Sequence, residues 1–188
     1  MNFITYFCKK TLNYELLNKF NYKSTKKLPK IKKIILNFGC KTTDIRYLAT
    51  SLLALELITC QQGKLTTTKY SNAILKLRKG NPVGCKVELR NQKMYNFIEK
   101  LLVEVFPKLK SFNSIKFNLK SKKISLSYKL NDNFVFTPIE KHYYLFNTLP
   151  KLDITILSNN KKTDELKFVI KSLHCPIRTS KYNSIGRV

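Results

Sequence analysis

A large excess of positive charge is the feature that most constrains this chain. Among its 188 residues, 36 Lys and Arg face 11 Asp and Glu, which gives a formal net charge of +25 at pH 7. A folded domain with that excess repels itself unless a polyanion neutralises it. Because 43% of the residues are hydrophobic and 12% are aromatic, the chain can still bury a core. We therefore expect a folded domain that binds a polyanion: nucleic acid or, as the alternative, an anionic membrane surface.

The cations recur through the segments that are predicted to fold and are not confined to a tail. Residues 1–33 hold nine cations and one acid, and residues 61–93 hold eight cations and one acid. Residues 94–130 hold eight cations and two acids. This spread favours several structural elements that together line one large RNA surface.

The sequence lacks the patterns of an active site or a metal centre. Five dispersed cysteines, an odd number, do not form a disulfide framework and indicate a reducing compartment. His142 and His174 are far apart, no CxxC pair accompanies them, and no Ser-His-Asp arrangement can be assigned. No apolar run approaches the ~18 residues of a membrane span. We expect no catalysis, no cofactor and no metal.

The hydrophobic pattern predicts a single α+β domain, with one mostly antiparallel sheet and helices packed on one face. Asp44 and Asn91 are expected to cap helices, and Gly63 and Pro107 to end them. We divide the chain into an N-terminal extension (1–10), the domain (11–176) and a basic C-terminal tail (177–188). The expected elements are helix 11–20, strand 31–38, helix 44–63, strand 65–69, basic loop 69–81, strand 83–89, helix 91–107, strands 115–119, 124–130 and 152–157, and a helix from 163 to about 175.

Three motifs resemble one family of ribosomal proteins. Residues 28–39, LPKIKKIILNFG, resemble its opening strand. Residues 80–90, GNPVGCKVELR, satisfy its G-x-P-[IV]-G-x-K-V-x-L-R pattern throughout. Residues 152–156, LDITI, followed by Asp164 and Glu165, resemble its closing strand and the start of its last helix. The family is large-subunit ribosomal protein five, the 5S rRNA-binding protein of the central protuberance, and the resemblance runs from about Leu12 to Pro176.

The resemblance implies a structural role in the large ribosomal subunit. Proteins of this family bind 5S rRNA, where the ribosome retains one, and large-subunit rRNA, beside neighbouring proteins of the central protuberance. The loop from Lys69 to Asn81 would point toward P-site tRNA, and a surface in the second half would face the small-subunit head near its protein number thirteen. The chain departs from the family pattern at 112–114 and 120–133, and contacts of 111–135 are not carried over.

The predicted RNA-binding side chains are basic residues and their hydrogen-bonding neighbours. Because Cys85, Val87 and Leu89 commit one face of their strand to the core, Lys86 and Arg90 lie on the other. Lysine and arginine neutralise phosphates, and the resemblance adds Asn and Thr side chains that hydrogen-bond sugars and base edges. The set is Lys30, Lys32, Asn37, Thr66, Lys69, Lys86, Arg90 and Lys93, with Lys76, Arg78 and Lys79 in the loop that faces tRNA.

The basic loop also contains apolar residues, which need a partner when they are exposed. We expect Ile74 or Leu75 to pack back on the domain or against a nucleotide. The loop itself should form a projecting, hairpin-like excursion that ends at Gly80-Asn81-Pro82.

Composition also predicts the compartment. Lys, Asn, Ile, Phe and Tyr are abundant, as an AT-rich coding genome favours. Only about ten residues precede the start of the resemblance, too few for a typical cleavable transit sequence. We expect a gene carried by an organelle genome and a protein of the mitochondrial matrix, with the plastid and the bacterial cytoplasm as alternatives.

Overall fold

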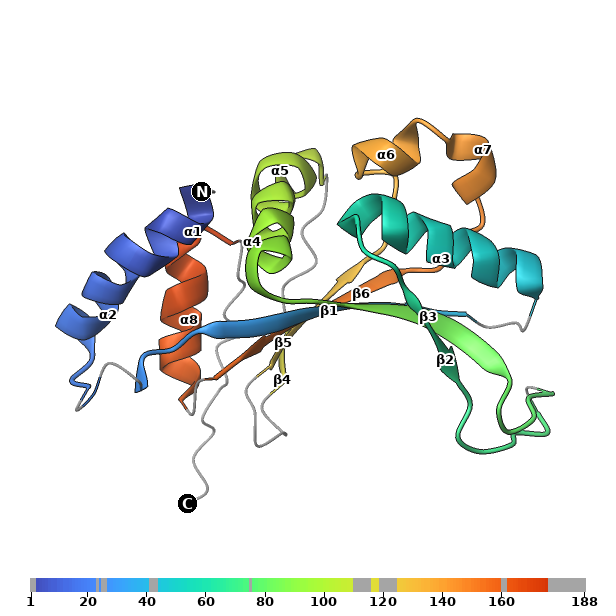
Figure 1. Cartoon of the computed structure of the whole chain (residues 1–188), viewed down its shortest axis with the longest axis horizontal. Helices are drawn as coiled ribbons and strands as arrows, with labels where there is room; N and C mark the ends of the chain where they lie inside the picture. Colours follow the sequence, from blue (N-terminus) through green and yellow to red (C-terminus); the bar gives the residue numbers. More distant parts are fainter. Residues whose placement is uncertain are drawn as a thin grey trace, which may run out of the picture.

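The sheet at the centre of the fold is antiparallel at every pairing. The computed structural model describes residues 3–22, 24, 27–40, 44–74, 76–109, 116–118, 125–159 and 162–175. Within them, six strands pair in the order β2-β3-β1-β6-β5-β4 (Figure 1). The strands are β1 (Ile31–Gly39), β2 (Lys64–Thr67), β3 (Pro82–Leu89), β4 (Lys116–Asn118), β5 (Ser125–Leu130) and β6 (Leu152–Ser158). The predicted α+β domain is confirmed.

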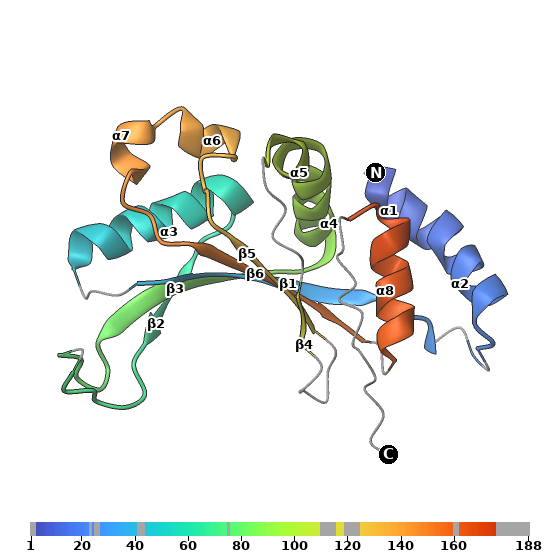
Figure 2. The ribbon, with the colours of Figure 1, turned by 180° about the vertical axis from the view of Figure 1, so that it is seen from behind.

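Helices cover one face of this sheet. Figures 1 and 2 show α3 to α7 on one side of the strands, with α1, α2 and α8 gathered beside one end. The helices are α1 (Phe3–Phe7), α2 (Asn13–Lys19), α3 (Ile45–Thr59), α4 (Asn91–Lys100), α5 (Phe106–Lys108), α6 (Thr137–Glu140), α7 (Tyr143–Phe146) and α8 (Thr163–Ser172). Among the described helices, none is long and apolar enough to cross a bilayer.

Alternation in β1 and β3 decides which side of the sheet the helices cover. Ile34, Leu36 and Phe38 are all fully buried, and they pair in register with Leu89, Val87 and Cys85, which are also buried. Because successive side chains of a strand point to opposite faces, the residues between them are left on the face away from the helices. The predicted apolar faces of both strands are thus confirmed.

The first helix begins earlier than the sequence pattern predicts. Helical backbone runs from Phe3 to Lys19, with a π-helical turn at Cys8–Leu12 between α1 and α2. Ile4 is only 5% exposed, so burial of an apolar side chain stabilises a turn whose aromatic residues have modest helix propensity. The predicted start near residue 11 is therefore wrong.

The end of α3 also differs from the prediction. Asp44 does occupy the N-cap position of α3, although its side chain makes no capping hydrogen bond. The helix ends at Thr59, because Cys60 adopts the left-handed conformation (φ 52°) and its N–H bonds to the Glu56 carbonyl. Gly63 has another role: a Cβ there would lie 2.7 Å from Leu52 Cδ1, so the missing side chain permits close packing on the helix.

The long second-half helix ends at Lys108, one residue after the predicted stop at Pro107. α4 passes through a π-helical turn at Leu101–Val105 and continues as α5, which contains Pro107. A proline lacks the N–H of a regular helical hydrogen bond, and a π-helical turn already interrupts the regular pattern just before it. At the other end Asn91 is not the cap; it is the first helical residue, with φ 51°.

Two short helices, α6 and α7, were not predicted. Pro138 stands in the first turn of α6, where its fixed φ suits helix entry.

The β5 and β6 predictions and the α8 start at Thr163 are confirmed. The predicted turn at 120–123, the tail at 177–188 and Leu75 lie outside the described residues.

Candidate nucleic-acid interface

The face of β1, β2 and β3 that points away from the helices carries polar and basic side chains around Ile35 of β1. Asn37 of β1 pairs with Lys86 of β3, and Lys86 pairs with Lys64 of β2. Thr66 follows on β2 opposite Gly84. Three neighbouring strands therefore present a row of hydrogen-bonding and cationic groups. We call this row, together with the side chains of Lys33, Glu88 and Arg90, the open face.

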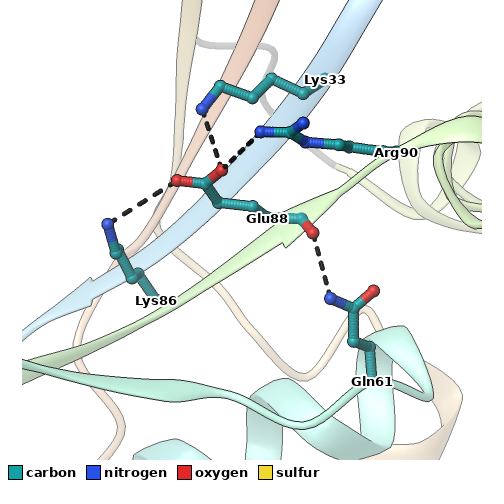
Figure 3. Close-up of polar contacts among 5 residues, drawn as sticks. All are labelled: Lys33, Gln61, Lys86, Glu88 and Arg90. Atoms are coloured by element: carbon teal, nitrogen blue, oxygen red, sulfur yellow. Dashed lines mark hydrogen bonds and ion pairs between the residues drawn. The ribbon is translucent and has the colours of Figure 1, made fainter.

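One carboxylate organises the cations of the open face. Glu88 Oε2 lies 2.9 Å from Lys33 Nζ and 3.6 Å from Arg90 Nη2, while Oε1 lies 3.7 Å from Lys86 Nζ. Figure 3 shows the three cations converging on this carboxylate from β1, from β3 and from the end of β3. Three positive charges around one negative charge leave a net positive cluster.

These cations also change the pKa of the Glu88 carboxyl. The pKa of the Glu88 carboxyl is lowered, chiefly by the hydrogen bond that Lys33 donates, while partial burial acts in the opposite direction. The Glu88 backbone is also held, because Gln61 Nε2 donates a hydrogen bond to its carbonyl at 3.1 Å (Figure 3). A shallow hollow lies beside these groups, with Gln61, Lys64, Lys86 and Arg90 among its lining residues. Amide and cationic groups of this kind suit phosphate and sugar oxygens.

Four predicted site residues meet on the open face: Asn37, Thr66, Lys86 and Arg90. Asn37, Thr66 and Lys86 are half-buried and Arg90 is exposed. The prediction missed Lys33, Lys64 and Glu88. Lys33 lies on the same side of β1 as Asn37, and Lys64 lies on the same side of β2 as Thr66. Strand periodicity alone could therefore have placed both lysines on this face.

The other predicted residues outside the loop lie elsewhere. Lys30 precedes β1 and lines a hollow with Cys8 and Lys9, near the α1–α2 end of the molecule. Lys32 is exposed and is skipped by the pairing of β1 with β6, which shifts register between Ile31 and Lys33. These two lysines are therefore separate from the Glu88 cluster.

Lys93 serves the fold directly. Its Nζ lies 3.3 Å from the Cys60 carbonyl, and Lys100 Nζ lies 3.4 Å from the Ile58 carbonyl. Both carbonyls belong to the C-terminal end of α3, where lysine side chains satisfy unpaired acceptors and interact favourably with the helix dipole. Lys93 is also exposed, so its predicted contact with RNA stays a prediction.

The basic loop between β2 and β3 is a cross-linked hairpin, as predicted. The Thr68 N–H donates to the Asn81 carbonyl at 2.9 Å, and the Gly80 N–H donates to the Thr68 carbonyl at 3.1 Å. Nearer the tip, Asn72 and Leu77 exchange backbone hydrogen bonds of 2.9 and 3.0 Å. Figure 1 shows the loop projecting from the side of the sheet away from the helices.

The loop's predicted ligands are all exposed, namely Lys69, Lys76, Arg78 and Lys79. Lys76 stands in the left-handed region (φ 52°) and its N–H closes a turn onto the Ala73 carbonyl. Ile74 is 91% exposed and does not pack back on the domain, so a contact of Ile74 with a nucleotide stays a prediction. The Asn72–Leu77 pair and the hydrogen bond from Lys76 to Ala73 place Ile74 at the hairpin tip.

The fold and the open face define a basic α+β domain suited to contact with a polyanion. The family model for the C-terminus of the ribosomal L5 family matches residues 82–177. The large ribosomal subunit protein uL5m of Reclinomonas americana is 35% identical over 168 residues, 88% of this chain and 92% of that protein. The uL5 of Malacoplasma penetrans is 33% identical over 181 residues, 92% of each chain. The chain belongs to the ribosomal L5 family, a family of ribosomal proteins rather than enzymes.

Proposed function

We propose that this protein is a structural constituent of the large ribosomal subunit that holds rRNA on its open face. The observation that carries this proposal is the row of Lys64, Lys86 and Asn37 across three strands, with Lys33 and Arg90 beside it. These residues come from a chain of net charge +25 that belongs to a ribosomal family. Alternating cations and hydrogen-bonding groups match an RNA backbone, which offers phosphate and 2′-hydroxyl oxygens together.

Within the subunit, the proposed RNA ligand is 5S rRNA, where present, or a large-subunit rRNA helix of the central protuberance. The family resemblance supports this assignment, and the β1 and β3 segments that carry the motifs also carry Asn37, Lys86 and Arg90. The projecting loop with Lys76, Arg78 and Lys79 is proposed to face P-site tRNA. Neighbouring central-protuberance proteins and the small-subunit head protein number thirteen complete the proposed partners.

The proposed compartment is the mitochondrial matrix. Two observations support it: the similarity to uL5m, and the abundance of Lys, Asn, Ile, Phe and Tyr, which AT-rich codons encode. Similarity to the uL5 of Malacoplasma penetrans keeps a bacterial-type ribosome as the alternative. Sequencing the small RNAs of the purified large subunit, together with its rRNA, identifies both the compartment and the 5S rRNA.

Salt dependence of RNA binding tests the open face directly. Lys86→Ala removes one phosphate contact, so affinity for 5S rRNA or a central-protuberance rRNA helix should fall for all sequences, and the log–log salt slope should flatten by about one unit. The matched control is Lys141→Ala, an exposed lysine between α6 and α7 on the helix side. It should leave affinity and slope unchanged.

Two outcomes would contradict the proposal. Affinity that does not depend on salt would exclude phosphate binding as its source. Flotation with anionic vesicles, combined with no association with ribosomal subunits, would favour the membrane-surface alternative.

A further inference from the structure

A large aromatic side chain is exposed within the basic β2–β3 loop. Tyr70 is 84% exposed, and it lies in a segment, residues 64–81, that contains five Lys and Arg and no acid. Exposure of a whole aromatic ring to water is unfavourable, and a partner that covers the ring removes that cost. The charge around the ring limits what this partner can be.

The hairpin fixes the backbone on both sides of Tyr70. Below it, the Thr68 N–H donates to Asn81 and the Gly80 N–H donates to Thr68; above it, Asn72 and Leu77 pair. Thr68 Oγ1 adds a hydrogen bond of 2.6 Å to the Arg78 carbonyl. Tyr70 therefore lies midway between two sets of cross-links, and the opposite leg at that level holds Arg78 and Lys79. The Tyr70 ring and the cations Arg78 and Lys79 therefore lie at the same height along a hairpin whose backbone is hydrogen-bonded on both sides.

This combination matches one kind of occupant better than any other. Lys69, Arg78 and Lys79 attract phosphates, and an aromatic ring at the same level accepts the base that those phosphates carry. A duplex keeps its bases stacked inside, so the base must be unpaired, as in a hairpin loop, a bulge or a single strand. A basic protein surface would be repelled, and a membrane surface would require a broader apolar area than one or two side chains.

We propose that Tyr70 is a stacking platform for an unpaired nucleobase of RNA, with Lys69, Arg78 and Lys79 holding the adjoining phosphates. Ile74, 91% exposed at the hairpin tip, offers a second apolar contact to the same RNA. This proposal rests on the proposed RNA-binding function and adds a base contact to it. It also predicts that the stacking contact contributes a part of the RNA-binding free energy that does not depend on salt concentration.

A fluorescent reporter can be placed at this position because the chain contains no tryptophan. Tyr70→Trp should retain RNA binding, and its fluorescence should be quenched by an RNA hairpin with an unpaired loop but not by a blunt duplex of the same stem. The matched control is Tyr144→Trp, since Tyr144 is 97% exposed in α7 on the helix side. Its fluorescence should not respond to either RNA.

Affinity measurements give an independent result. Tyr70→Ala should weaken hairpin binding about 10-fold, within the range for one lost base stack, while leaving the salt slope unchanged. Tyr70→Phe keeps the ring and should bind like the native chain. Equal affinity of Tyr70→Ala and native chain, with no quenching in Tyr70→Trp, would overturn the stacking proposal while the open-face function stood. Failure of the native chain to bind RNA at all would instead overturn the proposed function.

Discussion

At the residue scale, Glu88 opposes the charge of the surface in which it lies. It neutralises one of three surrounding cations, so Glu88→Gln should raise affinity for rRNA about three- to five-fold at low salt, on the order of 1 kcal/mol for a nearby unit charge. The gain should shrink as salt rises. Glu140→Gln is the matched control, because Glu140 lies in α6 on the helix side of the sheet and pairs only with Lys108 among the described ion pairs, at 3.3 Å. Weaker RNA binding by Glu88→Gln would show that the carboxylate positions its cations for RNA.

The same substitution has a defined effect on stability. The folded-state pKa of Glu88 is lowered from its ordinary value of 4.5, so its ion pairs stabilise the fold above that value and lose their contribution as pH falls through the folded pKa. Glu88→Gln should therefore cost up to about 1 kcal/mol at pH 7, because the pairs are partly solvated, and little near pH 2. Urea unfolding of both proteins at the two pH values measures the difference.

Of the predicted residues that lie on the open face, Lys86 and Arg90 are marked both by strand alternation and by a family motif. Lys86 and Arg90 alternate with buried residues on β3, so their orientation followed from local pattern. The Glu88 cluster was not predictable in this way, because Lys33 reaches Glu88 only through the register of β1 against β3. The hydrogen bond of Lys93 to the Cys60 carbonyl was not predictable for a similar reason, since that carbonyl lies at the end of a different helix.

At the element scale, the junction of β1, β2 and β3 depends on Gly84. A Cβ there would lie 2.6 Å from the Phe38 carbonyl oxygen and 2.9 Å from Thr66 Oγ1. Gly84→Ala should cost about 1–3 kcal/mol, because backbone in the centre of a sheet yields only with strain. Gly39→Ala is the matched control: Gly39 is the register partner of Gly84, and a Cβ there meets nothing within 4 Å.

Urea unfolding compares the two glycine variants, with the midpoint falling for Gly84→Ala at an unchanged m value. Equal midpoints for Gly84→Ala and the native chain would show that the strands separate easily at this point. A Cβ at residue 84 would push β2 and its Thr66 side chain away from β3. Because Thr66 lies on the open face, Gly84→Ala should bind RNA more weakly, whereas Gly39→Ala should bind RNA normally.

Strands were predicted more accurately than helix ends, for a physical reason. A buried strand such as β1 has a period-two pattern that identifies both its existence and its inner face. A helix end depends on backbone choices that composition marks weakly: Cys60, not a glycine, adopts the left-handed conformation after α3. The end predicted at Pro107 was closer, since the helical backbone stops one residue later, at Lys108.

At the scale of the whole molecule, the fold separates three surfaces. The helices cover one face of the sheet, the open face lies on the other, and the β2–β3 loop projects on the side away from the helices (Figures 1 and 2). The Glu88 cluster spans the central strands β1 and β3, whereas the loop's cations lie beyond the ends of β2 and β3. This arrangement predicts a division of labour, in which the sheet docks the protein and the loop reaches a second RNA.

Large subunits assembled with matched triple variants test that division. Lys76, Arg78 and Lys79 changed to Ala should incorporate normally, because the open face is intact, but these subunits should hold P-site tRNA less well as salt is raised. Lys33, Lys86 and Arg90 changed to Ala remove the same number of charges from the sheet and should reduce incorporation itself. Quantifying the protein in purified subunits, and then filter-binding of tRNA across a salt series, separates the two effects. Poor incorporation of the loop variant would show that the loop is an assembly anchor, because the charge lost is equal in both proteins and only its position differs.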